Sequence, residues 1–146
     1  MQHKNIIIGS DHAGYSLKER LKKYLIDSEY IVEDLGVFSE ESADYPVIAK
    51  LVANKAATEN KFAILVCGTG VGMCITANKI KGIRAVVCSD TSTARLSREH
   101  NNTNVLCLGA RIIGEVLAKD ICTIWLNSEF LGERHKKRLD MIENDE

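Results

Sequence analysis

The segment Phe62–Cys67, with the sequence FAILVC, is a run of six apolar residues without a polar residue between them. A strand with one face in water alternates apolar and polar residues, so an unbroken run is typical of a strand covered on both faces. Parallel strands need a crossover connection, which is usually a helix. The run therefore predicts an α/β fold with helices on both sides of a sheet.

The same unit repeats along the chain, with short apolar segments followed by longer amphipathic ones. We expect strands at 5–9, 30–35, 62–67, 84–88 and 104–108. We expect helices at 15–28, 47–58, 71–79, 91–99, 114–126 and 133–142. On the first helix, one face carries Leu17, Leu21, Tyr24 and Leu25, and the lysines lie elsewhere. The alternation predicts a doubly wound α/β domain around a parallel sheet.

Length, charge and cysteine content narrow the class of protein. We expect a single domain over residues 1–146, since 146 residues suit one compact domain. The formal net charge of -1 argues against a general nucleic-acid-binding surface. The first segment, MQHKNIII, is too short for the apolar core of a signal peptide or for a membrane span. The odd count of five cysteines argues for reduced thiols, and the lack of a C-x-x-C pair argues against a zinc site. Together with the short apolar N-terminal segment, this leads us to expect a cytoplasmic protein that binds no membrane.

The segment Cys67–Gly72, with the sequence CGTGVG, is the strongest candidate for chemistry. It leads from an expected strand into an expected helix, and its glycines let the main chain turn tightly. The N–H groups of such a turn, together with the helix N-terminus, form a site for an anion. The glycine spacing fits neither a dinucleotide fingerprint nor a P-loop. A tight turn without a ligand is the alternative.

Cys67 stands at the mouth of this glycine segment. A helix N-terminus lowers the pKa of a nearby thiol, and the thiolate is the reactive form. The neighbouring glycines therefore favour a reactive Cys67 over a merely buried one. We expect the other cysteines to be small buried apolar residues: Cys74, Cys88, Cys107 and Cys122.

Other polar residues follow the expected strands, where ligands bind in doubly wound folds. Asp11 either caps the first helix or holds a sugar hydroxyl, and His12 is placed to reach a phosphate. We expect His100, at the end of the fourth helix, to face the same crevice as an acid or base. Arg111 follows the fifth strand on the binding side.

A basic run opens the last helix. Arg134, His135 and Arg138 share a broad face of that helix. Such a run is usually only a solvated surface. Arginine is also suited to forked recognition of a phosphate, so a phosphate ligand would favour a binding role.

Several segments together resemble the ribose-5-phosphate isomerase B and galactose-6-phosphate isomerase family. They run in order and span nearly the whole chain. They are GSDHAG at 9–14, DLG at 34–36, DYP at 44–46, CGTGVGMCITANKIKGIRAVVC at 67–88, SREHNNTNVLCLGAR at 97–111 and RHKKR at 134–138. The glycine segment with the stretch 97–111 is the most specific part.

The resemblance implies a three-layer α/β/α sandwich with a Rossmann-like five-stranded parallel sheet, and a C-terminal helix that packs on a partner subunit. It implies homodimers, or dimers of dimers, whose subunits share each active site. The implied reaction interconverts D-ribose 5-phosphate and D-ribulose 5-phosphate, the aldose–ketose step of the non-oxidative pentose phosphate pathway. It needs no metal and no cofactor.

The resemblance also implies roles for single residues. Cys67 matches the base that moves a proton between C2 and C1 through a cis-enediolate. Thr69 matches the hydroxyl that passes protons between O1 and O2. His100, with help from Asp11, matches the residue that opens the furanose ring. Main-chain N–H groups of the glycine segment match the donors to the enediolate, and these belong to Gly68, Gly70, Val71 and Gly72.

The remaining matches concern substrate binding. Asn101 and Tyr45 match positions that contact the sugar, and His12 and Arg111 match phosphate ligands. Three positions match contacts that reach over from the partner subunit, and they are Arg134, His135 and Arg138.

One branch of the family has serine in place of the cysteine and a glutamate base six residues later. This chain has Cys67 and Met73 at those positions, so it resembles the cysteine-base branch. Two alternatives stay open. One is an isomerase of a six-carbon substrate, allose 6-phosphate or galactose 6-phosphate. The other is a phosphate-binding module without catalysis, because a fold alone does not determine a function.

Overall fold

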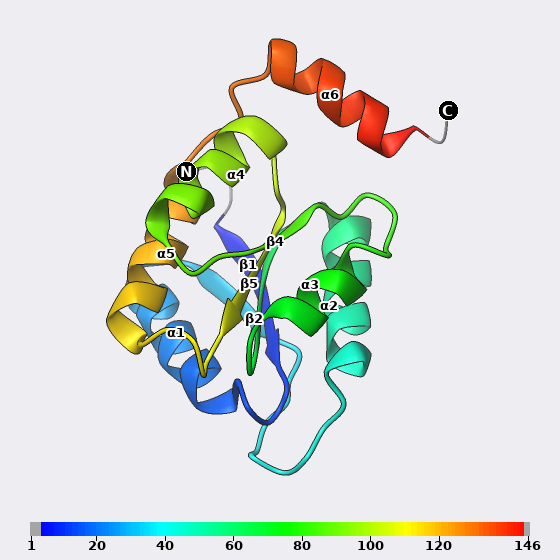
Figure 1. Cartoon of the computed structure of the whole chain (residues 1–146). Coiled ribbons are helices and arrows are strands. Elements are labelled where there is room, and N and C mark those ends of the chain that lie inside the picture. Colours follow the sequence, from blue (N-terminus) through cyan, green and yellow to red (C-terminus); the bar gives the residue numbers. More distant parts are fainter. Residues whose placement is uncertain (1–3, 145–146) are drawn as a thin grey trace.

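The computed structural model describes residues 4–144, so the first three and last two residues of the predicted domain lie outside it. The elements in chain order are β1 (Asn5–Ser10), α1 (Tyr15–Asp27), β2 (Ile31–Asp34), α2 (Tyr45–Glu59), β3 (Phe62–Cys67), α3 (Val71–Ala77), β4 (Ala85–Val87), α4 (Thr91–Asn101), β5 (Val105–Gly109), α5 (Glu115–Asn127) and α6 (Arg134–Glu143). Figure 1 labels them along the chain. The strands pair in parallel in the order β2-β1-β3-β5-β4. This arrangement confirms the predicted five-stranded parallel sheet.

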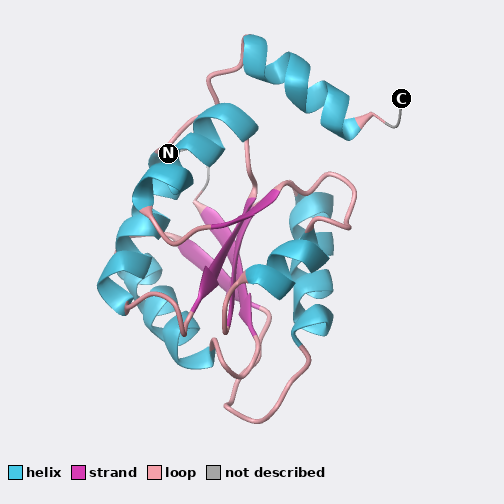
Figure 2. Ribbon diagram, viewed as in Figure 1, coloured by secondary structure: helices cyan, strands magenta, loops and turns pink. Residues whose placement is uncertain are grey.

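Helices cover both faces of the sheet, as Figure 2 shows. Successive residues of a strand point to opposite faces. In β3, Ile64 and Val66 pack with residues of α1 and α5, whereas Leu65 and Cys67 pack with residues of α2 and α3. All six residues of β3 are buried. The unbroken apolar run therefore belongs to a strand covered on both faces, which confirms the three-layer prediction.

The observed boundaries lie within two residues of the predicted ones. The helix α2 starts two residues early, at Tyr45, with Pro46 in its first turn, where a missing N–H costs nothing. The helix α4 runs two residues further than predicted, to Asn101. The one surprise in α1 is Lys18, which the sequence pattern places off the apolar face and the structure buries completely.

The two ends of the sheet carry different groups. The loops after β1, β3 and β5 lie together at the carboxyl end, the lower end in Figure 1. The helix α4 runs back from β4 to the amino end of β5, so its last residues lie at the opposite end. There Arg84, which precedes β4, donates from Nε to the carbonyl oxygens of Asn101 at 3.2 Å and Asn102 at 2.9 Å. The helix α6 also lies at this amino end.

None of the helices within residues 4–144 has the length and apolar character that a membrane span requires. The longest of those described, α2, has 15 residues, whereas a span takes about 20.

Candidate active site

The end of β3 places Cys67 beside the main chain of the glycine segment. The Gly70 N–H donates to Cys67 Sγ at 3.1 Å, and the cysteine is 5 % exposed. Gly70 has a φ of 82°, a left-handed conformation that glycine adopts at little steric cost. The next residue, Val71, begins α3. The sulfur therefore lies at a helix N-terminus, with apolar neighbours on one side and a main-chain amide on the other.

The loops after β3 and β5 form one unit. The exposed Thr69 accepts a hydrogen bond at Oγ1 from the Val71 N–H at 3.3 Å. A Cβ added to Gly109 would lie 2.6 Å from the main chain of Thr69, so the loops touch there. The Arg111 N–H donates to the Gly68 carbonyl at 2.9 Å, and a Cβ on Gly68 would lie 3.3 Å from Nη1 of Arg111. The exposed cation of Arg111 thus lies against the glycine segment.

The loop after β1 brings Asp11 and His12 to the same end of the sheet. Asp11 is 6 % exposed, and its Oδ1 accepts from the Gly14 N–H at 3.0 Å, which closes the turn before α1. The Asp11 N–H donates to the Val66 carbonyl at 3.2 Å and ties this loop to β3. His12 Nδ1 lies 3.1 Å from the N–H and 3.3 Å from the carbonyl oxygen of Ala43. The half-buried His12 ring is therefore held through Ala43.

Tyr45 opens α2 and covers the far side of the glycine segment. A Cβ on Gly72 would lie 2.5 Å from the Tyr45 ring, so only glycine leaves room for that ring. Tyr45 is nevertheless 39 % exposed. The carboxyl end of the sheet thus gathers Asp11, His12, Tyr45, the segment 67–72 and Arg111.

His100 and Asn101 lie at the other end of the sheet. The helix α4 has 11 residues, so its last turn lies about 16 Å from its start beside the carboxyl end of β4. The prediction that His100 faces the same crevice as Cys67 is therefore wrong within one chain. The signal was available in the sequence, because a helix that follows a parallel strand returns to the amino end of the sheet.

The first turn of α6 lies beside His100. The rings of His100 and His135 stack, with centroids 4.3 Å apart and planes 13° apart. Burial lowers the pKa of His135 below its ordinary value of 6.5, and the charges of His100, Arg134 and Arg138 lower it further. His135 is buried while Arg134 and Arg138 are exposed, so the basic run is only partly a solvated surface.

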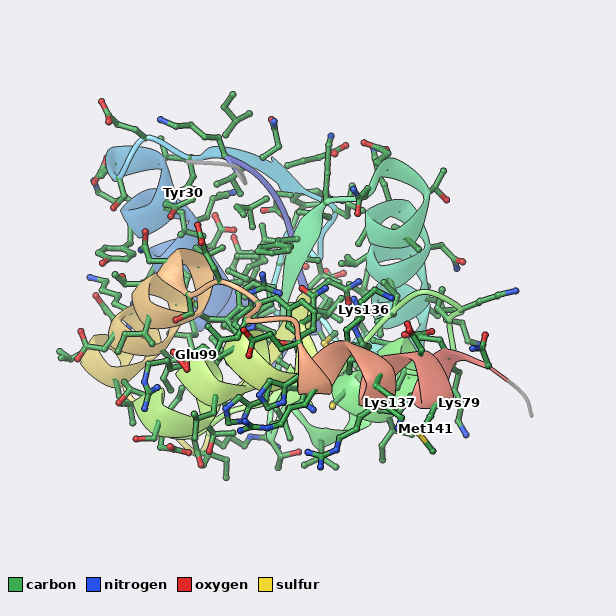
Figure 3. The ribbon with its side chains drawn as sticks, turned by 90° about the horizontal axis from the view of Figure 1, so that it is seen from above. Tyr30, Lys79, Glu99, Lys136, Lys137 and Met141 are labelled. Atoms are coloured by element: carbon green, nitrogen blue, oxygen red, sulfur yellow. The ribbon has the colours of Figure 1, made fainter. Side chains whose placement is uncertain are left out.

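A cavity of about 670 Å³ opens between α6 and the rest of the chain at this amino end. It is lined by residues 78–86, Ser97, Asn101, Thr103, Leu139, Ile142 and Glu143. Figure 3, which looks down on this end, shows α6 lying across it, with Lys136, Lys137 and Met141 labelled on the helix. Cys67 does not line this cavity, so it is separate from the glycine segment.

The other cysteines divide into two kinds. Cys88, Cys107 and Cys122 are buried as predicted, and burial raises the pKa of Cys88 and Cys122 to about 12. Cys74 is only partly buried, and a hydrogen bond with Cys107 lowers its pKa to about 7. Sequence reasoning missed this pair, because Cys74 and Cys107 meet only through the packing of α3 on β5.

The chain has clear relatives among known proteins. The family model Ribose/Galactose Isomerase matches residues 6–142. Ribose-5-phosphate isomerase B of Escherichia coli is 47 % identical over 140 residues, covering 95 % of this chain and 94 % of that protein. D-erythrulose-4-phosphate isomerase of Pectobacterium atrosepticum is 41 % identical over 140 residues, covering 94 % of this chain and 92 % of that protein.

Solved structures agree with this fold. A ribose 5-phosphate isomerase of Thermotoga maritima has a TM-score of 0.94 and 47 % identity, covering 97 % of this chain and 99 % of that one. Ribose-5-phosphate isomerase B of Mycoplasma genitalium, solved with bound ribulose-5-phosphate, has a TM-score of 0.92 and 41 % identity, covering 95 % of this chain and 93 % of that one. By its sequence and its fold, the chain belongs to the ribose/galactose isomerase family.

Proposed function

We propose that the protein interconverts D-ribose 5-phosphate and D-ribulose 5-phosphate. The observation that carries this proposal is the contact of Cys67 Sγ with the Gly70 N–H at the start of α3. Aldose–ketose isomerisation needs a base near C1 and C2 and donors for the charge of the enediolate. The carboxyl end of the sheet offers both, and the Escherichia coli relative is named for this reaction.

In the proposed reaction, the Cys67 thiolate removes the proton from C2 of the open-chain aldose. The released electron pair forms the C1–C2 double bond of a cis-enediolate, and negative charge develops on O1. The thiol then returns the proton to C1, which gives the ketose, while Thr69 passes a proton between O1 and O2. Reversal of these steps converts the ketose to the aldose.

The predicted amide donors divide into two groups. The Gly70 N–H donates to Cys67 and the Val71 N–H donates to Thr69, so these two hold the reacting side chains. We assign the enediolate oxygens to the N–H groups of Gly68 and Gly72. Gly72 lies in the first turn of α3, where amides have no partner within the helix, and Gly68 lies in the loop that precedes this turn.

The phosphate and the sugar have matching groups at the same end of the sheet. We assign the phosphate to His12 and to Arg111, whose guanidinium lies against Gly68. Tyr45 and Asp11 are the proposed sugar contacts on either side of the glycine segment. The free thiol needed as the base fits the proposed cytoplasmic location.

We further propose a homodimer, or a dimer of dimers, in which each site takes residues from two copies. One chain cannot bring its own His100 and Cys67 to one sugar, because they lie at opposite ends of the sheet. The groups that complete the site from the second copy are His100, Asn101, Arg134 and Arg138, with His135 supporting His100. A two-fold dimer makes two such sites from one kind of contact.

The first test is Cys67→Ala in a coupled assay with ribose 5-phosphate. We expect kcat to fall by about 10³-fold or more, because the proton-transferring group is lost. Inorganic phosphate should still bind to this variant, since the proposed phosphate ligands are other residues. Near wild-type turnover by this variant would rule out the proposed base.

Mixing two inactive variants tests the sharing of sites. The Cys67→Ala and His100→Ala chains are unfolded together and then refolded. A hybrid dimer, with one chain of each kind, should contain one site in which both Cys67 and His100 are intact. Random pairing makes about half of the dimers hybrid, so about a quarter of wild-type activity should return. If Cys67 and His100 act within one chain, no activity returns on mixing.

A panel of substrates decides the carbon-chain length. The relative from Pectobacterium atrosepticum is named for a four-carbon sugar phosphate, so kcat/KM is compared for ribose 5-phosphate, D-erythrulose 4-phosphate, allose 6-phosphate and galactose 6-phosphate. The proposal expects the highest value for ribose 5-phosphate. Binding of these compounds without any turnover would instead support a phosphate-binding module.

A further inference from the structure

Lys18 is a fully buried lysine that the proposed mechanism does not use. Its side chain is 0 % exposed, and Nζ donates to both carboxylate oxygens of Asp34 at 2.9 Å. Nζ also donates to the carbonyl oxygen of Val37. The rings of Tyr15 and Phe38 lie 5.3 Å and 5.1 Å from the same nitrogen. All three hydrogen-bond donors of the ammonium group therefore have an acceptor, and Glu19 Oε2 lies 3.3 Å from the nitrogen as a second acidic neighbour.

Stability alone does not explain such an arrangement. Taking an ion pair out of water costs free energy, and apolar residues of similar size often serve stability equally well. The geometry shows what an apolar residue could not do. Lys18 binds Asp34 and Val37, which lie on either side of Gly36, and the Gly36 N–H donates to Asp34 at 2.9 Å. The ammonium group thus holds both ends of the turn after β2.

That turn is also joined to the loop after β1. The Ser10 N–H donates to the Gly36 carbonyl at 2.7 Å, and the Val37 N–H donates to the Ser10 carbonyl at 2.9 Å. Ser10 directly precedes Asp11 and His12. Lys18 therefore fixes the point from which residues 38–44 depart toward α2.

Residues 38–42 are exposed, so their course depends on the anchors at both ends. The far anchor is Ala43, whose N–H and carbonyl group both face His12 Nδ1. Two residues later Tyr45 begins α2 against Gly72. The segment held by Lys18 at one end thus holds His12 and Tyr45 at the other.

We propose that Lys18 is a positioning residue that sets the orientation of His12 and the position of Tyr45 by anchoring residues 37–45. The inference rests on the proposed function, in which His12 binds phosphate and Tyr45 contacts the sugar. With Nδ1 held by Ala43, the other ring nitrogen, Nε2, points away from Ala43 and serves the ligand. Lys18 itself touches no substrate atom in this arrangement.

The test compares Lys18→Met with Lys22→Met. Lys22 is the matched control, because its Nζ also binds Asp34 at 2.9 Å but its side chain is 27 % exposed and does not reach Val37. We expect Lys18→Met to raise KM for ribose 5-phosphate about tenfold and to change kcat less than about threefold, since binding groups move and the base does not. Lys22→Met should leave both constants near the wild-type values.

A second readout reports on His12 itself. Ring ¹⁵N signals of His12 give the tautomer, and they should shift in Lys18→Met and stay in place in Lys22→Met. Titration with inorganic phosphate, followed at the same signals, should show weaker binding in Lys18→Met alone. These readouts do not depend on turnover, so they judge the role of Lys18 even if the protein isomerises none of the sugars tested.

If Lys18→Met does not fold, the double variant Lys18→Met with Asp34→Asn takes its place. It removes the negative charge that Lys18 no longer balances and that only Lys22 still pairs, and the amide oxygen of the new asparagine can still accept the Gly36 N–H. The same rise in KM and the same shift of the His12 signals are expected. A folded variant with wild-type KM and unchanged His12 signals overturns the proposal, and so does an equal effect of Lys22→Met.

Discussion

Lys18 and Arg98 are both buried cations behind residues of the proposed site, but their partners differ. Lys18, at the carboxyl end of the sheet, lies against the carboxylate of Asp34. Arg98, at the amino end, is 5 % exposed and donates to neutral oxygens, the Thr103 carbonyl at 2.6 Å and Asn102 Oδ1 at 2.8 Å. One charge is matched by an opposite charge, and the other is held by dipoles.

The pKa shifts express the same difference. Burial lowers the pKa of Arg98 to about 10, helped by the charge of Arg84, although the Phe62 ring lies 4.5 Å from the guanidinium carbon. Burial by itself would raise the pKa of Asp34, but hydrogen bonds from Lys18, Lys22 and the Gly36 N–H lower it overall. The titration of Asp34 therefore depends on the charge of Lys18, whereas the hydrogen-bond acceptors of Arg98 carry no charge that titrates.

The largest expected effect is on stability. Lys18→Met should lower the free energy of unfolding by about 3–5 kcal/mol, because it leaves Asp34 buried without its main partner. Arg98→Met should lower it by about 1–3 kcal/mol, because it leaves only neutral acceptors unpaired. Urea unfolding of both variants measures the difference. An equal or greater loss for Arg98→Met would break the comparison.

The next effect is a dependence of stability on pH that arises from the ion pair of Lys18 with Asp34. The folded-state pKa of Asp34 lies below its ordinary value of 3.8, so its stabilisation is complete above that pH and is lost as the pH falls through the folded-state value. Unfolding free energies of the wild type should therefore drop more steeply below about pH 4 than those of Asp34→Asn. Arg98→Met should retain the wild-type dependence of unfolding free energy on pH. A weaker pH dependence in Arg98→Met would contradict the proposed difference between Lys18 and Arg98.

A smaller effect on stability is expected from Thr103, whose carbonyl oxygen accepts a hydrogen bond from Arg98. Its Oγ1 accepts from Trp125 Nε1 at 2.9 Å and lies 2.9 Å from Ser97 Oγ. Thr103→Val leaves the buried indole N–H unpaired, so we expect a loss of about 1–2 kcal/mol in urea unfolding. Thr103 anchors no residue at the carboxyl end of the sheet, so KM should change only if His100 moves. The control Thr103→Ser keeps the hydroxyl group and should retain most of the wild-type stability.

The smallest effect concerns α6. Glu143 pairs with Arg84 Nη1 at 2.7 Å, and both side chains are partly exposed. Glu143→Gln should cost less than about 0.5 kcal/mol in the same unfolding assay, because exposed ion pairs contribute little. A larger loss would mean that α6 contributes to the folding of the single chain.

The sequence predicted the fold, and it predicted that the residues after β1, β3 and β5 lie together at one end of the sheet, because these signals are local. The apolar run of β3 and the glycine spacing after Cys67 each specify their own structure. The misplacement of His100 came from treating the end of a helix like the end of a strand. Lys18 was beyond prediction for another reason. Its partners Asp34 and Val37 lie at the end of β2 and just after it, and no periodicity in α1 distinguishes a buried lysine from an exposed one.

The placement of His100 and Cys67 at opposite ends of one sheet has a consequence for the enzyme at low concentration. In the proposed arrangement, a dissociated chain that keeps its fold has Cys67 at one end and His100 at the other, and neither residue has the partner that completes a site. Specific activity should therefore decline on dilution, while the circular dichroism spectrum stays constant. Catalysis would then report directly on how tightly the subunits associate.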